Sequence, residues 1–249
     1  MISSKQNALI KLIKSLSDKK NRDNLSLYLA EGVKTVSEAV ETGQKIYALI
    51  YTEKALNLLP SKVFSAALRA EIVSDEVFKC VSGEVSPQGA LAALYKPETR
   101  LPSSDYSVFL DGVSDPANVG AIIRTAAAAG YCDVYLTEDC ADAFNPKSVR
   151  ASMSGIFRVN LIKGEREKLI NSIKIPVAVA DMNGKNVFSL KNENPVCLVI
   201  GNEGNGVSEI LKRRADITIS IPMAGGMESL NAAVSAGILM YNLKNFQER

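Results

Sequence analysis

Apolar residues in the first hundred positions alternate between the three-to-four-residue repeat of a helix and the short runs of a strand. Leu9, Leu12, Ile13 and Leu16 fall on one helical face, which predicts a first helix over 9–16. Runs rich in β-branched and aromatic residues predict strands at 27–30, 46–51, 72–73 and 90–95. Amphipathic stretches between them predict helices at 33–41, 62–70 and 75–81. This order indicates a small α/β domain over residues 1–98.

The polar segment KPETRLPSSD at 96–105 has two prolines and no periodicity, which is typical of a linker. After it, apolar runs predict strands at 107–110, 133–136, 159–162, 177–180, 197–200 and 217–219. Helical patterns predict helices at 119–129, 147–153, 166–173, 208–212 and 230–243. Alternating strands and helices favour a mostly parallel sheet covered by helices, so residues 105–249 are expected to form a second α/β domain.

The composition excludes several kinds of catalytic and metal site. Hydrophobic residues make up 47% of the 249 positions, the chain has no histidine, and its four cysteines form no CxxC pair. The lack of histidine excludes histidine-based triads and imidazole acid–base catalysis, and no metal-ligand spacing is visible, so no metal is expected. No apolar run reaches the ~18 residues of a membrane helix. Lysines interrupt the apolar N-terminus, so we expect no secretory signal and a cytoplasmic protein.

Charge is close to balanced, with a net value of +2, but it is uneven along the chain. The segment Met1–Arg22 carries six basic residues and one acidic residue, and Lys5, Lys11 and Arg22 are among the basic ones. Such a cluster either binds phosphates or forms an ordinary solvated helix face. Charge alone leaves these two interpretations equally open.

A first cluster of unusual residues, DGVSDPANVGAIIR, runs from Asp111 to Arg124 directly after a predicted strand. Asn118 suits a helix cap, and Gly120 permits close backbone approach. Arg124 follows in alanine-rich sequence, where it would pair with an acid or receive an anion. Taken alone, this cluster is also explained by a capped helix with a surface arginine.

A second cluster, GNEGNG at 201–206, ends a strongly apolar strand. Ligands of parallel sheets bind beyond the carboxyl ends of the strands. The glycine spacing differs from the dinucleotide-binding fingerprint, and no P-loop lysine follows, so a nucleotide-binding oxidoreductase or NTPase is disfavoured.

A third cluster begins at Pro222, which stops a strand, and continues through Gly225 and Gly226 to Ser229, which can cap the next helix. That helix has a face of unusually small residues from Ala232 to Gly237. The small face indicates close helix packing, and packing does not exclude a functional role.

Taken in order, N118-x-G-x-I-x-R124, I200-G-N-E-G-x-G206 and I221-P-M-x-G-x-x-x-S-L-N231 resemble the motifs of the SpoU/TrmH family of RNA 2′-O-ribose methyltransferases. The resemblance covers roughly residues 106–246. A looser resemblance links the first domain to the amino-terminal substrate-binding domain of that family, through Arg22, Glu31-Gly32 and Pro87-Gln88-Gly89.

The resemblance implies a SPOUT-type parallel sheet with a carboxyl-terminal trefoil knot, preceded by a small α/β substrate-binding domain. It implies a homodimer and S-adenosyl-L-methionine as cofactor. The implied cofactor-binding residues are Ile200, Gly201, Asn202, Gly204, Ile221, Pro222, Met223, Leu230 and Asn231.

The implied reaction is methylation of a ribose 2′-hydroxyl in RNA. Arginine stays protonated, so we interpret Arg124 as an electrostatic clamp on phosphate and developing alkoxide and not as a general base. The other implied catalytic residues, which order the site or bind cofactor and substrate, are Asn118, Glu203, Ser229 and Asn231.

The expected RNA contacts are Lys5, Lys11, Arg22, Lys147 and Arg150. The separate first domain resembles that of ribosomal RNA-modifying members, so ribosomal RNA is the expected substrate. A tRNA 2′-O-methyltransferase, a non-catalytic RNA- or ribosome-binding protein of the same fold, and a knotted enzyme that methylates a base or a protein remain alternatives.

Overall fold

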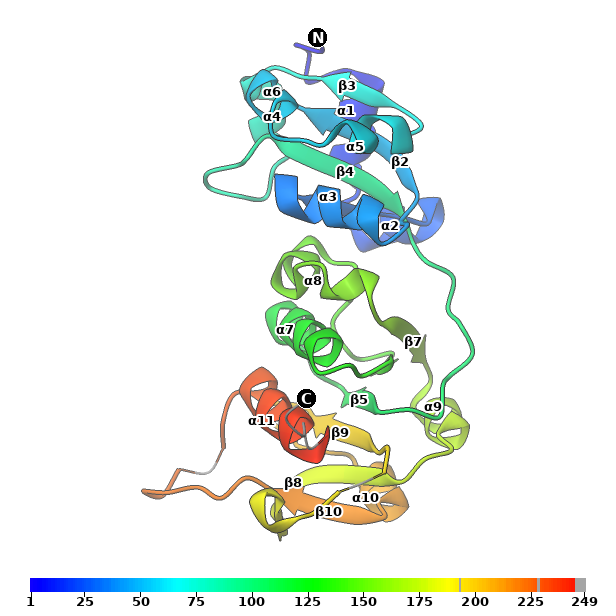
Figure 1. Cartoon of the computed structure of the whole chain (residues 1–249), viewed down its shortest axis with the longest axis vertical. Helices are drawn as coiled ribbons and strands as arrows, with labels where there is room; N and C mark the ends of the chain where they lie inside the picture. Colours follow the sequence, from blue (N-terminus) through cyan, green and yellow to red (C-terminus); the bar gives the residue numbers. More distant parts are fainter. Residues whose placement is uncertain (193, 228, 245–249) are drawn as a thin grey trace. The chain divides into compact units, whose positions relative to one another are not determined.

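The computed structural model describes residues 1–192, 194–227 and 229–244 (Figure 1). The chain divides into two compact units. The first combines Met1–Glu98 with Asp142–Phe157, and the second combines Thr99–Ala141 with Arg158–Arg249. Residues 245–249, which end the predicted second domain, lie outside the described residues. Every helix in the described part of the chain is too short or too polar to cross a bilayer.

The first unit is built on a four-stranded sheet in the order β1-β4-β2-β3. The strands are β1 (Leu27–Glu31), β2 (Ile46–Tyr51), β3 (Ala70–Ile72) and β4 (Ala90–Tyr95). β4 runs antiparallel to β1 and β2, and β3 runs parallel to β2. The helices are α1 (Ala8–Ser15), α2 (Lys19–Leu25), α3 (Val33–Glu41), α4 (Glu53–Leu56), α5 (Ser61–Ala66), α6 (Asp75–Lys79) and, from the distant segment, α8 (Pro146–Ser152) with the 3₁₀ turn η1 (Gly155–Phe157).

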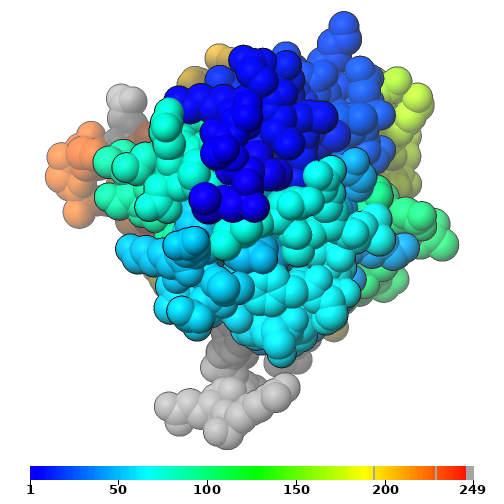
Figure 2. All heavy atoms as spheres, turned by 90° about the horizontal axis from the view of Figure 1, so that it is seen from above, coloured from blue at the N-terminus to red at the C-terminus, as the bar shows by residue number. Residues whose placement is uncertain are grey.

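The helical face predicted from leucine and isoleucine spacing is the core face of α1. Leu9, Ile13 and Leu16 are at most 4% exposed and pack with residues of β1, β2 and β4, and Leu12 is partly buried against them. The N-terminus joins this unit because Ile2 pairs with Val73. Figure 2 shows the consequence on one face, where the dark-blue first residues lie against the cyan segment that contains β3.

The second unit is built on a six-stranded parallel sheet in the order β10-β8-β9-β5-β6-β7. The strands are β5 (Ser107–Asp111), β6 (Asp133–Thr137), β7 (Asn160–Gly164), β8 (Val177–Asn186), β9 (Cys197–Gly201) and β10 (Ile217–Ser220). The helices are α7 (Pro116–Ala128), α9 (Arg166–Ser172), α10 (Glu209–Arg214) and α11 (Ala232–Lys244), with a 3₁₀ turn η2 (Val187–Ser189). The predicted mixed α/β fold with a parallel sheet is confirmed.

The strand order reverses at β5. The chain runs outward from β5 through β6 to β7, and β8 and β9 then lie on the other side of β5. Such a reversal opens a crevice at the carboxyl ends of the central strands, where ligands of parallel sheets bind. The second and third motif clusters follow β9 and β10 at this edge.

Several local predictions were wrong. The helix α2 lacks an apolar face, so periodicity missed it, although Asp18 caps it by accepting from Lys20 N at 2.8 Å. Helix α7 begins at Pro116, and its cap is Asp115, not Asn118. Asn231, not Ser229, accepts from the first backbone N–H groups of α11.

Candidate active site

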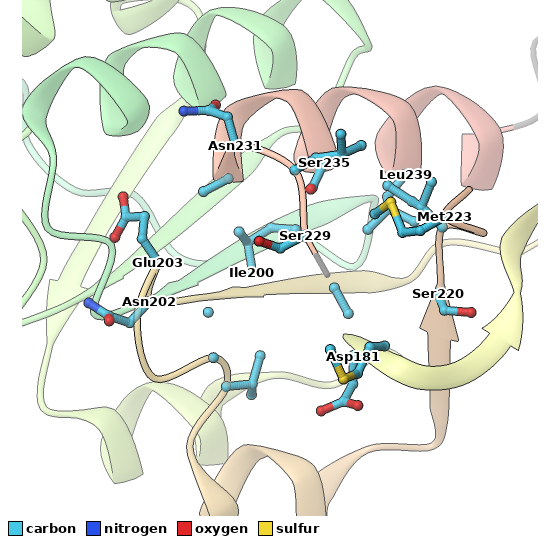
Figure 3. Close-up of a pocket in the computed structure, with 18 of the residues that line it drawn as sticks. Asp181, Ile200, Asn202, Glu203, Ser220, Met223, Ser229, Asn231, Ser235 and Leu239 are labelled. Carbon is cyan, nitrogen blue, oxygen red and sulfur yellow. The ribbon is translucent and has the colours of Figure 1, made fainter. Parts of the chain in front are cut away.

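A cavity of about 1010 Å³ lies at the carboxyl edge of the second sheet (Figure 3). All nine residues that the resemblance implied for cofactor binding line it. Glu203 and Ser229 also line it. Gly206, Gly226 and Ala232 of the predicted clusters lie on the wall as well. The wall further includes residues that the sequence did not single out, among them Ala180, Asp181, Met182, Val207, Lys212, Ile219, Ser220, Met227 and Leu239.

The loop after β9 forms one rigid wall of this cavity. Asn202 and Gly206 exchange two backbone hydrogen bonds of 3.0 and 2.9 Å, which close the loop. The Asn202 side chain donates to Gly112 O at 2.7 Å and accepts from Gly204 N at 2.9 Å. A Cβ at Gly201 would collide with the backbone of Gly206, so this turn requires glycine.

Hydrogen bonds join the three motif clusters through their side chains. Asn118 donates to Glu203 Oε1 at 2.8 Å, and Asn231 donates to Asn118 Oδ1 at 2.9 Å. Ser114 donates its backbone N–H and its hydroxyl to Glu203 Oε2, both at 3.3 Å. Burial raises the pKa of Glu203, but the hydrogen bonds from Asn118 and Ser114 outweigh it, so the pKa is lower than the ordinary value. An ionised carboxylate therefore orders this network at neutral pH.

A second network fixes the far end of the same loop. Asp111, 2% exposed at the end of β5, accepts from Ser208 N at 2.7 Å and from Arg166 Nε at 2.6 Å. Arg166 also donates to Asp139 at 2.8 Å. Asp111 was part of the first predicted cluster, but its role was missed because Arg166 and Ser208 are distant in sequence.

The residues present fit S-adenosylmethionine. The cavity volume lies at the upper end of the ~300–1,000 Å³ typical of small-molecule sites. Ile221, Met223 and Leu239 supply apolar surface for an adenine ring, and the loop after β9 supplies backbone groups for hydrogen bonds. Glu203 and Asn231 supply polar side chains at one end of the cavity (Figure 3), and Asn118 links them through hydrogen bonds. In the described part of the chain, no group of acidic or cysteine side chains could hold a metal ion.

Arg124 is exposed on α7 and is not among the residues that line the cavity. The structure therefore joins Asn118, Glu203 and Asn231 directly, and it leaves Arg124 on the outer surface of the second unit. Helix α7 packs on α11, where Gly237 lies close to Thr125.

The structure contradicts one of the five predicted RNA contacts, Arg22. Arg22 is 1% exposed, and its guanidinium bonds to Leu16 O, Ser17 O and the carboxylate of Asp142. A buried and fully paired guanidinium cannot meet a phosphate, so Arg22 is structural.

The other four predicted RNA contacts all belong to the first unit, although more than a hundred residues separate them. Lys5 is exposed and pairs with Glu76 at 2.7 Å, and Lys11 and Lys147 are exposed. Arg150 is partly buried, with its guanidinium against Gly83. Their role in RNA binding stays a prediction.

Comparison with known proteins agrees with the fold. Residues 105–241 match the model of the SpoU rRNA Methylase family, and residues 7–92 match the MRM3-like substrate binding domain. The chain is 30% identical to the 23S rRNA (guanosine(2553)-2′-O)-methyltransferase RlmP of Bacillus subtilis, over 98% of both chains.

Two solved structures extend this similarity. The AdoMet-bound rRNA methyltransferase from Sinorhizobium meliloti superposes with a TM-score of 0.88 at 30% identity, covering 98% of this chain and 96% of the other. The SpoU methyltransferase AviRb from Streptomyces viridochromogenes, in complex with AdoMet, gives 0.86 at 26% identity, covering 96% and 98%.

Proposed function

Since this chain belongs to the SpoU rRNA methylase family, we propose that it transfers a methyl group from S-adenosylmethionine to a ribose 2′-hydroxyl of ribosomal RNA. The relative that matches over nearly the full length is named for this reaction on 23S rRNA. The match of residues 7–92 to a substrate binding domain supports a role of the first unit in binding the RNA. The activity would then take place in the cytoplasm, with the ribosomes.

The observation that carries this proposal is the cavity itself. The second and third sequence clusters line one space of suitable volume and polarity, and Asn118 of the first cluster is hydrogen-bonded to both. The chain also superposes over 98% of its length on an AdoMet-bound rRNA methyltransferase.

Bound S-adenosylmethionine supplies an electrophilic methyl group on a positively charged sulfur. The protein needs to hold a ribose oxygen in line with that group, and positioning of this kind accounts for a large part of such a rate enhancement. Asn118, Glu203 and Asn231 form the ordered polar wall beside that position. Ser229 adds a hydroxyl that can donate to cofactor or substrate.

Arg124 would stabilise the phosphate next to the target nucleotide and the oxygen as it loses its proton. Because Arg124 is exposed on α7, it is available to RNA, and we propose that a homodimer completes the site around it. The face of α11 supports this, since Val234 is 51% exposed on the helix that packs on α7. We further propose that the segment through β10 and α11 forms the family's trefoil knot.

The direct test is methylation of ribosomal RNA in vitro by the purified protein, followed by mapping of 2′-O-methyl sites. We expect Arg124→Ala to abolish transfer while S-adenosylhomocysteine still binds by calorimetry. Arg213→Ala is the matched control, because Arg213 is an exposed arginine of the same unit on α10. Equal loss of transfer and cofactor binding in Arg124→Ala would contradict the assigned role.

The same experiment separates the alternatives. Methylation of transfer RNA but not ribosomal RNA would change the substrate, and a base-modified product would change the reaction. Binding of RNA without methyl transfer, in the presence of bound cofactor, would indicate a non-catalytic factor. Sedimentation of the protein and of Val234→Glu tests the homodimer, which the charged variant should dissociate.

A further inference from the structure

The strand β8 loses its pairing with β10 where it borders the cavity. Thr218 of β10 pairs with Val179, but the next residue, Ile219, pairs with Lys185, so residues 180–184 bulge out of the sheet. A Cβ at Gly184 would collide with the backbone of Ile219, which shows how tightly the chain re-enters the sheet. Bulges of this kind redirect side chains beside active sites. This one brings Asp181 and Met182 to the cavity wall.

The carboxylate of Asp181 retains capacity to accept hydrogen bonds. Its Oδ1 accepts from Asn183 N at 3.0 Å, and its Oδ2 lies 3.7 Å from Lys212 Nζ, beyond hydrogen-bond distance. Lys212 forms an ion pair with Asp181 at this distance and a shorter one with Glu209, at 3.1 Å. The side chain of Asp181 is only 22% exposed, so a bound ligand would compete with little water. Glu203, the other acid of the described wall, already has its donors.

The two ends of the cavity differ in chemistry. The apolar end contains Met223 and Leu239, and the polar end contains Glu203 and Asn231 (Figure 3). The cofactor's adenine suits the first end, and its sulfur must approach the second. The ribose joins adenine to sulfur, so it must lie between them. Asp181 lies on the wall below Ile200 and Ser229 in Figure 3, between the two ends.

We propose that the Asp181 carboxylate accepts hydrogen bonds from the ribose hydroxyls of the cofactor and selects an adenosyl group with an intact ribose diol. An ionised carboxylate has only acceptors, and a ribose diol has two hydroxyl groups that can donate to it, so the pair is complementary. Acids near strand ends bind ribose hydroxyls in the same way in dinucleotide-binding folds. This inference rests on the proposed cofactor and names a residue that none of the three motifs contains.

The test is calorimetric binding of S-adenosylhomocysteine, its 2′-deoxy and 3′-deoxy analogues, and 5′-methylthioadenosine, which has the ribose but lacks the amino-acid end. We expect Asp181→Ala to weaken S-adenosylhomocysteine and 5′-methylthioadenosine by the same factor, about tenfold or more. With the native protein, at least one deoxy analogue should bind more weakly than S-adenosylhomocysteine by a similar factor. With Asp181→Ala, the difference in affinity between that analogue and S-adenosylhomocysteine should be less than about twofold. Asp181→Asn keeps an acceptor oxygen, so its affinity for S-adenosylhomocysteine should lie between those of the native protein and Asp181→Ala.

Glu209→Gln is the control, since it removes a negative charge beside the same lysine without touching the cavity. It should bind all four ligands like the native protein. If Asp181→Ala weakens S-adenosylhomocysteine but not 5′-methylthioadenosine, the carboxylate acts on the ammonium group and the proposal is wrong. It is also wrong if native affinities for the deoxy analogues are undiminished. Failure of S-adenosylhomocysteine to bind the native protein would instead refute the proposed function.

Discussion

Replacing Asp142 with alanine should destabilise the first unit strongly, because it isolates a buried charge. Arg22 is 1% exposed, and its Nη2 lies 2.6 Å from Asp142 Oδ2. Removing one partner of a buried ion pair costs about 3–5 kcal/mol. The guanidinium keeps its bonds to Leu16 O and Ser17 O, at 2.9 and 2.7 Å, so we expect the lower end, about 3 kcal/mol.

The free energy of unfolding is best measured in urea by far-UV circular dichroism, because the chain contains no tryptophan to report by fluorescence. Hydrogen exchange of peptides from α2 and β1 then assigns the loss to the first unit. Glu41→Ala is the control, since its pair with Lys62 is about half exposed on both sides and is worth at most ~1 kcal/mol. If Asp142→Ala costs no more than this control, the buried pair does not stabilise the unit and the reasoning fails.

Three further changes test the second unit. Asp111→Asn would turn a donor toward Ser208 N or its arginine partner, so we expect faster amide exchange in the loop 201–208 and about tenfold weaker binding of S-adenosylhomocysteine. Glu203 has a lowered pKa, so its stabilisation of the hydrogen-bond network is complete above the ordinary value of 4.5 and is lost as the pH falls through the lowered value. The affinity for S-adenosylhomocysteine, measured from pH 7 to 4, should therefore fall more steeply in the native protein than in Glu203→Gln. Tyr131→Phe removes a 3.2 Å hydrogen bond to Met240 O and should cost about 0.5–1.5 kcal/mol in urea unfolding, with unchanged cofactor affinity. No loss, or a loss confined to cofactor binding, would contradict this last expectation.

The wall of the cavity could be predicted because its signals are local. A glycine-rich turn such as 201–206 and a proline stop such as Pro222 each mark the end of an apolar strand, and parallel strands bring such ends to one edge. The same locality explains the errors at Asn118 and Ser229, where a neighbouring residue competes for the same capping role.

What could not be predicted depends on pairings across the fold. Whether Arg22 meets a phosphate or a carboxylate is decided by Asp142, 120 positions away. The bulge that exposes Asp181 to the cavity arises only from the register of β8 against β10. Neither arrangement leaves a periodic trace in the sequence.

The segment Asp142–Phe157 has a consequence for how this chain can be divided. Phe144 packs against Tyr28 at 4.8 Å between ring centroids, and α8 lies beside β1, so the substrate-binding portion is finished only by residues encoded within the methyltransferase portion. A fragment that stops at Glu98 would leave that aromatic surface and a buried guanidinium uncovered. The two portions therefore cannot be exchanged between family members as independent domains. A folded chimera would have to take Asp142–Phe157 from the same parent as the N-terminal sequence.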